Sequence, residues 1–302
     1  MRILSVGALT QDTILRVDAL PRSHGKYVAL GAMQIASGMA SSAACAAQRL
    51  GAAATLWASA GDDAVGDQLV AEISAEGVDC RNVRRVAGGK SALSAILVDP
   101  QGERVIVPYY DPKTHADPHE LPFDISAFAA VLADVRWPRA SELALSAAKA
   151  AGLPAILDAD TAARDVLERL LPHATHIVAS EPAAAILCEG AAPSEACELL
   201  GARSGQFVAV TCGGAGVYWR DAASTETRHT PAPKIQPVDT LAAGDVFHGA
   251  FATALGEAWA MERVIRFASA AAAVKCLRFG GRLAAASRVE TLEMMARSYP
   301  AD

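Results

Sequence analysis

The chain has 302 residues, of which 52% are hydrophobic and 20% are charged, and its formal net charge at pH 7 is −6. A chain of this length buries a large core, as one domain or as one domain with an appendage. The negative charge and the lack of a run of Lys and Arg argue against nucleic-acid or acidic-membrane binding, and no apolar run reaches the length of a membrane span.

From the first residues and the cysteines we expect neither a signal peptide nor a secreted disulfide scaffold. The apolar stretch 3–9 is too short for a signal peptide, and the six cysteines show no CxxC pairs. We therefore expect reduced thiols and a cytoplasmic protein with no membrane partner.

The first third of the chain alternates strands and helices. Residues 2–9 form an apolar, β-rich run that predicts a buried first strand. A helix at 40–50, a strand at 55–60 and a helix at 67–76 follow. Two successive βα units indicate a parallel sheet.

Two extended segments interrupt this alternation. Residues 13–36 lack helical periodicity, and residues 92–98 and 104–109 form a hairpin pattern around the turn residues 99–102. We predict that these segments pair with each other as a small β lid, formed by residues 12–36 and 88–110. Residues 1–11, 37–87 and 111–302 then form the α/β domain.

Polar side chains follow three strands predicted in the centre of the chain, at 131–133, 155–157 and 176–179. These side chains are Asp134 and Arg136, Asp158 and Asp160, and Ser180 and Glu181. Because ligands bind beyond the carboxyl ends of parallel strands, the three sets predict the rim of a site. Ser180 and Glu181 could equally cap a helix.

Asp12 comes just past the end of the first predicted strand. That position suits the binding of a small polar ligand, although an Asp that fixes the turn with Thr13 is an equal alternative. Farther on, a strand at 207–210 is followed by TCGGAG and a strand at 217–219. The glycines there either contact a nucleotide or make a hairpin.

The stretch 239–251, DTLAAGDVFHGAF, predicts an anion-binding helix start. Three prolines, Pro231, Pro233 and Pro237, keep the approach extended, and apolar residues recur at helical spacing from Val246. The first turn, formed by Ala242, Ala243 and Gly244, therefore offers free N–H groups at the positive end of the helix dipole. Asp245 at its edge is either a general base or a charge that complements the dipole.

The sequence DTLAAGDVF resembles the signature D-T-x-G-A-G-D-x-F of the ribokinase-like (PfkB) carbohydrate kinases. The resemblance implies a three-layer α/β/α domain with a mostly parallel central sheet, a small β-sheet lid, and ATP and Mg²⁺ as cofactors. It makes Asp245 the catalytic base and the turn from Ala242 to Gly244 the anion hole. Ala242 departs from the glycine of the family, and it costs about 1 kcal/mol if that position needs a positive φ.

Other motifs extend the resemblance and assign further residues to ligands. SGMASSAACAAQRLGA resembles the sugar-binding signature, in which Gly38 and Ser42 would join Asp12 around the sugar. SEPAA leaves Glu181 as the carboxylate that would act on magnesium through water. The residues that the resemblance assigns to the nucleotide are Thr211, Gly213, Gly216, Thr240, Lys275 and Gly280.

The segments GKYVA, GERVIV and LADVRW are similar to one branch of the family, the 6-deoxy-6-sulfofructose kinases. The resemblance to this branch implies that Lys26 and Arg136 bind a sulfonate, while Pro108 stands where the branch has a sulfonate-binding Asn. We therefore expect an ATP-dependent kinase that phosphorylates a primary hydroxyl of a ketohexose-like sugar, with 6-deoxy-6-sulfofructose as a candidate.

Two alternatives to this function stay open. One is a kinase for a neutral sugar of the fructose, ribose or 2-keto-3-deoxygluconate type, which Pro108 favours. The other is a noncatalytic nucleotide- or sugar-binding protein, which Ala242 favours. A requirement for K⁺ stays open as well, and the uncovered sheet edge of the lid predicts a homodimer.

Overall fold

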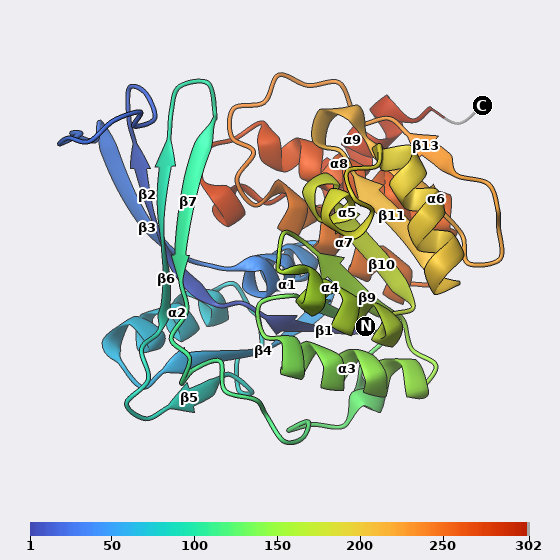
Figure 1. Cartoon of the computed structure of the whole chain (residues 1–302), viewed down its shortest axis with the longest axis horizontal. Coiled ribbons are helices and arrows are strands. Elements are labelled where there is room, and N and C mark those ends of the chain that lie inside the picture. The colour runs from blue at the N-terminus through green and yellow to red at the C-terminus, as the bar shows by residue number, and fades with distance from the viewer. Residues whose placement is uncertain (301–302) are drawn as a thin grey trace.

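The computed structural model describes residues 1–300, and the chain forms a layered α/β body with a second, smaller sheet at one side (Figure 1). The strands of the large sheet are β1 (Arg2–Gly7), β4 (Ala53–Gly61), β5 (Arg84–Val86), β8 (Ala130–Asp134), β9 (Ala155–Ala159), β10 (His176–Ser180), β11 (Phe207–Thr211), β12 (Val217–Arg220) and β13 (Arg228–Thr230). Their spatial order is β13-β12-β11-β10-β9-β8-β1-β4-β5. All neighbours from β11 to β5 pair in parallel, and β12 and β13 are antiparallel additions.

Helices cover both faces of the large sheet. One face carries α1 (Met39–Arg49), α2 (Ala64–Ala75), α7 (Ala243–Gly256), α8 (Met261–Cys276) and α9 (Arg288–Ser298). The other carries α3 (Pro138–Ala150), α4 (Arg164–Leu170), α5 (Glu181–Leu187) and α6 (Pro193–Ser204). The predicted three-layer fold is therefore confirmed. Within residues 1–300, no helix combines the length and apolar character that a bilayer span requires.

Strand β1 illustrates why the sheet needs cover on both faces. Its side chains alternate between two core clusters, with Ile3 in one and Leu4 and Val6 in the other, and all three are buried. The sequence of a strand that is buried on both faces is a continuous apolar run, and such a run at residues 2–9 predicted this strand.

The smaller sheet, which we call the lid, joins β2 (Thr10–Arg16), β3 (Gly31–Ser37), β6 (Ala92–Val98) and β7 (Arg104–Tyr109). Their order is β3-β2-β6-β7, with β2 and β6 parallel and the outer pairs antiparallel. The prediction that these extended segments leave the main sheet and pair with each other is confirmed. Three buried side chains on its inner face, Ile14, Ile35 and Ile96, pack together as a small core next to Leu241.

The start of the lid differs from the expectation. Strand β1 ends at Gly7, two residues before the predicted end, and β2 begins at Thr10, two residues before the predicted start of the lid. Asp12 therefore lies inside a lid strand, opposite Ile35, and does not directly follow the first strand. The prediction was wrong here because Ala8 and Leu9, which connect the two strands, are themselves apolar and buried. The apolar run therefore passes through the point where the chain changes sheets.

Candidate active site

Two cavities meet where the lid faces the carboxyl ends of the parallel strands. The larger has a volume of about 650 Å³ and the smaller about 280 Å³. The smaller cavity is lined by Asp158 near the end of β9, Asp160 just after it, Ser180 at the end of β10 and Thr211 at the end of β11. With Arg136, four of the six predicted rim residues thus lie around one site at the carboxyl ends of the strands. Asp134 does not line this cavity; its Oδ2 accepts from the amides of Ala8 and Ala40.

Asp12 enters the smaller cavity from lid strand β2. Its side chain is buried, and Thr10 Oγ1 donates a hydrogen bond to Asp12 Oδ1 at 3.0 Å. Burial raises the pKa of this carboxyl, while hydrogen bonds from Ser37 and Ser94 oppose the rise. A buried carboxylate that opens into a cavity can accept hydrogen bonds from ligand hydroxyls.

Gly38 brings the backbone to the wall of the same cavity. It caps the N-terminus of α1 with φ 114°, and a Cβ at this position would lie 2.6 Å from the carbonyl oxygen of Ala8. Only glycine fits both the positive φ and this approach. Ser42 lies one turn later, is fully buried and does not line the cavity, whereas Ser37, 3.5 Å from it between hydroxyl oxygens, does.

The start of α7 forms the boundary between the two cavities. Ala242 caps this helix with φ 63° and ψ 13°, so the alanine does occupy the left-handed conformation in which it is strained. The amide of Ala243 donates to Thr240 O at 3.2 Å and is not free. In the described part of the chain no acceptor contacts the amides of Ala242, Gly244 and Asp245, so two of the three predicted anion donors are free and Asp245 supplies a third.

Asp245 lies in this first helical turn and lines the smaller cavity. Burial raises its pKa well above the ordinary value, and the nearby carboxylates Asp158, Asp160 and Asp12 raise it further. A carboxylate with a raised pKa is a stronger base and can accept a proton from a hydroxyl bound beside it.

His248 binds the backbone of the first turn of α7, a role that the sequence did not indicate. Its Nδ1 donates to Gly244 O at 2.7 Å, and its Nε2 lies 3.3 Å from Asp158 Oδ1. Burial lowers the pKa of His248 and raises that of Asp158. Nε2 also lies 3.3 Å from Val178 O, so both ring nitrogens have a polar partner. Because C=O and N–H point in opposite directions across a trans peptide, fixing Gly244 O orients the free N–H of Asp245.

Arg136 lies at the rim of the smaller cavity, as the sequence indicated. Its guanidinium donates to Thr161 O at 2.9 Å and lies 3.3 Å from Asp160 Oδ2. Lys26 is exposed in the loop between β2 and β3 and does not line either cavity. Pro108 lines the smaller cavity, and so does Tyr110, whose pKa burial raises to about 12.

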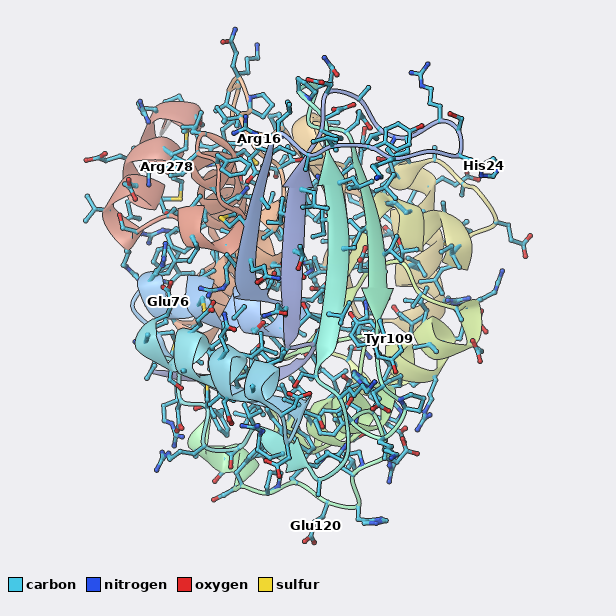
Figure 2. The ribbon with its side chains drawn as sticks, turned by 90° about the vertical axis from the view of Figure 1, so that its left-hand side faces the viewer. Arg16, His24, Glu76, Tyr109, Glu120 and Arg278 are labelled. Atoms are coloured by element: carbon cyan, nitrogen blue, oxygen red, sulfur yellow. The ribbon has the colours of Figure 1, made fainter. Side chains whose placement is uncertain are left out.

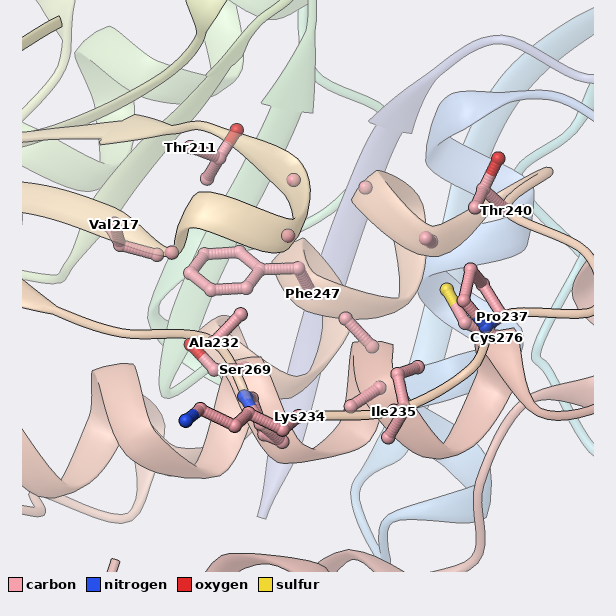
Figure 3. A pocket seen from close by; sticks show the side chains of 18 of the residues that line it. Thr211, Val217, Ala232, Lys234, Ile235, Pro237, Thr240, Phe247, Ser269 and Cys276 are labelled. Carbon is pink, nitrogen blue, oxygen red and sulfur yellow. The ribbon is translucent and has the colours of Figure 1, made fainter. Parts of the chain in front are cut away.

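The larger cavity has an apolar interior with a polar edge (Figure 3). Phe247 from α7, Val217 from β12 and Ile235 from the proline-rich approach surround it, and Ser269 of α8 contributes a hydroxyl. Four residues assigned to the nucleotide from the sequence line it, namely Thr211, Gly213, Gly216 and Thr240. A flat base fits between apolar walls of this kind, with its phosphates toward the polar edge.

Lys275 and Gly280 do not line this cavity, contrary to the expectation. Lys275 is fully buried, and its Nζ lies 3.1 Å from Asp239 Oδ2, while the amides of Gly280 and Gly281 donate to the same oxygen at 3.0 and 2.9 Å. These groups instead hold Asp239, whose Oδ1 accepts from the Leu241 amide at 2.8 Å. The charged cluster therefore shapes the turn that leads into α7.

Glu181 also lies outside both cavities, exposed at the start of α5, where Ser180 caps the helix. Within residues 1–300, no group of three or more His, Cys, Asp or Glu side chains could hold a metal ion. A magnesium ion at this site would need ligands from a bound nucleotide and from water.

Comparisons with known proteins define the class to which this fold and site belong. The profile of the pfkB family carbohydrate kinases matches residues 2–287. The chain belongs to this family, and it is a carbohydrate kinase.

Individual relatives share almost the whole chain. The ribokinase of Bacillus subtilis is 28% identical over 97% of this chain and 99% of its own length, and that of Haemophilus influenzae is 27% identical over 96% and 97%. A crystal structure from Agrobacterium tumefaciens, provisionally assigned as a ribokinase, is 44% identical with a TM-score of 0.96, covering 100% of this chain and 99% of that one. The Arabidopsis thaliana ribokinase bound to ribose and ATP shares the fold at 22% identity with a TM-score of 0.83, covering 97% and 98%.

Proposed function

We propose that the chain transfers the γ-phosphoryl group of ATP to a primary hydroxyl of a ketohexose-like sugar. One observation carries this proposal: the nucleotide-sized cavity and the sugar-sized cavity share the start of α7, where Ala243 and Gly244 line both. The structure of a relative with ribose and ATP supports ATP as the donor. The donor phosphates and the acceptor hydroxyl then approach each other at the free N–H groups of the helix.

In the proposed mechanism Asp12 holds sugar hydroxyls and Asp245 accepts the proton of the attacking hydroxyl. The amides of Gly244 and Asp245 donate to the oxygens of the phosphoryl group as charge redistributes in the transition state. His248 keeps the Asp245 amide directed into the cavity through its bond to Gly244 O. Closure of the lid over the sugar excludes water, which would otherwise compete as acceptor.

Magnesium fits this site as an ion coordinated by ATP phosphates and water. The hydroxyl of Thr211, which lines both cavities, and the carboxylate of Asp160 in the smaller one offer the hard oxygen atoms that magnesium prefers. Glu181 is proposed only for an outer contact through water. Bound there, the ion would neutralise charge on the β- and γ-phosphates.

The 6-sulfonated ketohexose is a second acceptor candidate, and Arg136 favours it. Its guanidinium lies at the cavity rim and could exchange the 3.3 Å contact with Asp160 for an anionic group. Asp12, Asp158 and Asp160 give the same cavity a negative lining, which favours a neutral sugar. Pro108, which offers no donor, and the distant Lys26 weaken the sulfonate assignment.

A panel of acceptors tests the proposal. ADP formation would be measured with ATP and Mg²⁺, with and without K⁺, against 6-deoxy-6-sulfofructose, fructose, fructose 6-phosphate, ribose and 2-keto-3-deoxygluconate. We expect a ketohexose to give the highest kcat/KM. A preference for ribose would contradict the ketohexose assignment, and a preference for the sulfonated sugar would assign Arg136 to the sulfonate.

We also propose that residues 12–36 and 88–110 act as a lid on the body formed by 1–11, 37–87 and 111–302, and that the lid mediates a homodimer. Apolar side chains on its outward face, considered below, support this assembly. The proposed compartment is the cytoplasm, since all six cysteines are free thiols.

A further inference from the structure

Arg104 occupies a special position between the two cavities. Five residues line both of them, namely Arg104, Thr211, Thr240, Ala243 and Gly244. Arg104 is the only one of the five with a charged side chain. A cationic guanidinium therefore lines the boundary at which the two cavities meet.

The register of the lid explains how a residue of β7 reaches the junction. Arg104 pairs with Val98, and its side chain lies on the same face of the strand as Ile106 and Pro108, which also line the smaller cavity. From there Arg104 Nη1 donates to Thr240 Oγ1 at 2.6 Å. The carbonyl of Thr240 in turn accepts from Ala243, so the arginine is attached to the turn that begins α7.

Within the part of the chain that the structure describes, the charge of Arg104 has no acidic partner. Among residues 1–300, no carboxylate oxygen lies within 4.0 Å of this guanidinium, although most arginines around the molecule are paired. Its one side-chain contact, to a neutral hydroxyl, uses one of five N–H donors. A planar cation with unused donors is well suited to bind phosphoryl oxygens.

We propose that Arg104 binds the γ-phosphoryl group of ATP as it is transferred, an inference that rests on the proposed function. In the step, the bond from the γ-phosphorus to the β–γ bridging oxygen breaks and a bond to the sugar hydroxyl oxygen forms. The hydroxyl proton moves to Asp245, and ADP leaves with the bonding electron pair. Because Arg104 belongs to the lid, the cation reaches the phosphoryl group only when the lid lies over the site.

The test compares Arg104→Gln with Arg104→Lys and with a matched control, Arg16→Gln. Arg16 is exposed at the end of β2 in the same lid sheet and lines neither cavity. Dissociation constants for ADP and for a nonhydrolysable ATP analogue would be measured with Mg²⁺ by calorimetry, because nucleotide binding needs no identified sugar.

We expect Arg104→Gln to raise the dissociation constant of the ATP analogue by about tenfold and to leave that of ADP unchanged, since only the analogue carries a γ-phosphoryl group. With the best acceptor, kcat should fall by roughly 100-fold. Arg104→Lys should recover part of the analogue affinity and part of the kcat. Arg16→Gln should have the nucleotide affinities and the kcat of the wild type. If Arg104→Gln lost affinity equally for ADP and for the analogue, or lost none, Arg104 would not bind the γ-phosphoryl group. The kinase proposal would stay intact. Failure of the wild type to bind either nucleotide would overturn both.

Discussion

Individual carboxylates give the active site its chemistry, and Asp245 is central among them. It is the one acidic side chain in the first turn of α7, beside free backbone N–H groups. If it acts as the base, Asp245→Asn removes the proton acceptor and leaves the shape of the site unchanged. We expect kcat to fall by at least about 100-fold, the scale of general-base catalysis.

The control for Asp245→Asn is nucleotide affinity, measured by calorimetry. Removal of a negative charge beside the phosphates should leave ADP binding intact or slightly tighter. A variant that keeps most of its kcat would show that Asp245 only complements the helix dipole.

The pKa of Asp245 predicts how activity depends on pH. Burial and then the carboxylates Asp158 and Asp160 raise this pKa, and the base must be deprotonated to act. The value of kcat/KM should therefore fall as pH decreases through a pKa above the ordinary range of Asp. In Asp160→Asn one repelling negative charge is lost, and this lowers the pKa of Asp245.

A pH profile of kcat/KM from pH 5 to 9 checks this prediction, because that ratio reports the free enzyme. The acidic limb of Asp160→Asn should lie at lower pH than that of the wild type, whatever its absolute rate. If the acidic limb of Asp160→Asn stayed in place or moved to higher pH, the group that titrates in this limb would not be Asp245.

At the scale of elements, the start of α7 contains a measurable strain. Ala242 has φ 63°, where an L-residue costs about 1–2 kcal/mol relative to glycine. Ala242→Gly removes this cost but adds about 0.4–1 kcal/mol of backbone entropy to the unfolded state. We expect the free energy of unfolding to stay equal or to rise by up to about 1.6 kcal/mol, the difference between these two contributions.

Denaturant unfolding of Ala242→Gly and of a control, Ala71→Gly, measures this effect. Ala71 is exposed within α2 at ordinary helical geometry, so glycine there should cost about 0.5–1 kcal/mol. Equal losses in the two variants would mean that the turn relaxes around Ala242 at no cost.

Elements with strong local signals could be predicted from the sequence. The hairpin strands β6 and β7 have the predicted bounds because turn residues 99–102 separate two β-branched runs. The short strands β5 and β13 and the helix α6 were not predicted. The two strands have three residues each, too few for a period, and pair at opposite edges of the large sheet.

Tertiary packing determines which of the predicted ligand-binding side chains reach the cavities, and the sequence alone could not show this. Motif spacing and family resemblance predicted that residues 12, 38, 136 and 245 bind ligands, and the fold brings all four to the lining of the smaller cavity. Motif spacing could not show that Lys275 turns away to Asp239, or that Lys26 lies on an exposed loop. The roles of His248 and Arg104 depend on contacts to Asp158 and Thr240, which are 90 and 136 positions away in the sequence.

The outward face of the lid carries exposed apolar side chains that could form the interface of the proposed homodimer. In the β6–β7 register, Leu93 lies opposite Tyr109, and Val105 and Val107 lie on the same face. All four side chains are exposed, Val107 at 60%, and Figure 2 shows this sheet uncovered with Tyr109 at the end of its edge strand. Burying a large apolar side chain contributes about 1.5–3 kcal/mol, so pairing of two such faces would stabilise a dimer.

We therefore predict that the wild type sediments at twice the mass of one chain and that Val107→Lys sediments as a single chain. A lysine there would place a charge inside the proposed interface, where it has no partner. The control is Val289→Lys on α9, where the valine is 66% exposed and distant from the lid in sequence and fold. Because Val107 pairs with Ala95 on the face opposite the cavities, a loss of dimer with unchanged sugar KM would assign this face to assembly alone. A wild type that stays a single chain at all concentrations in sedimentation velocity would contradict the lid interface.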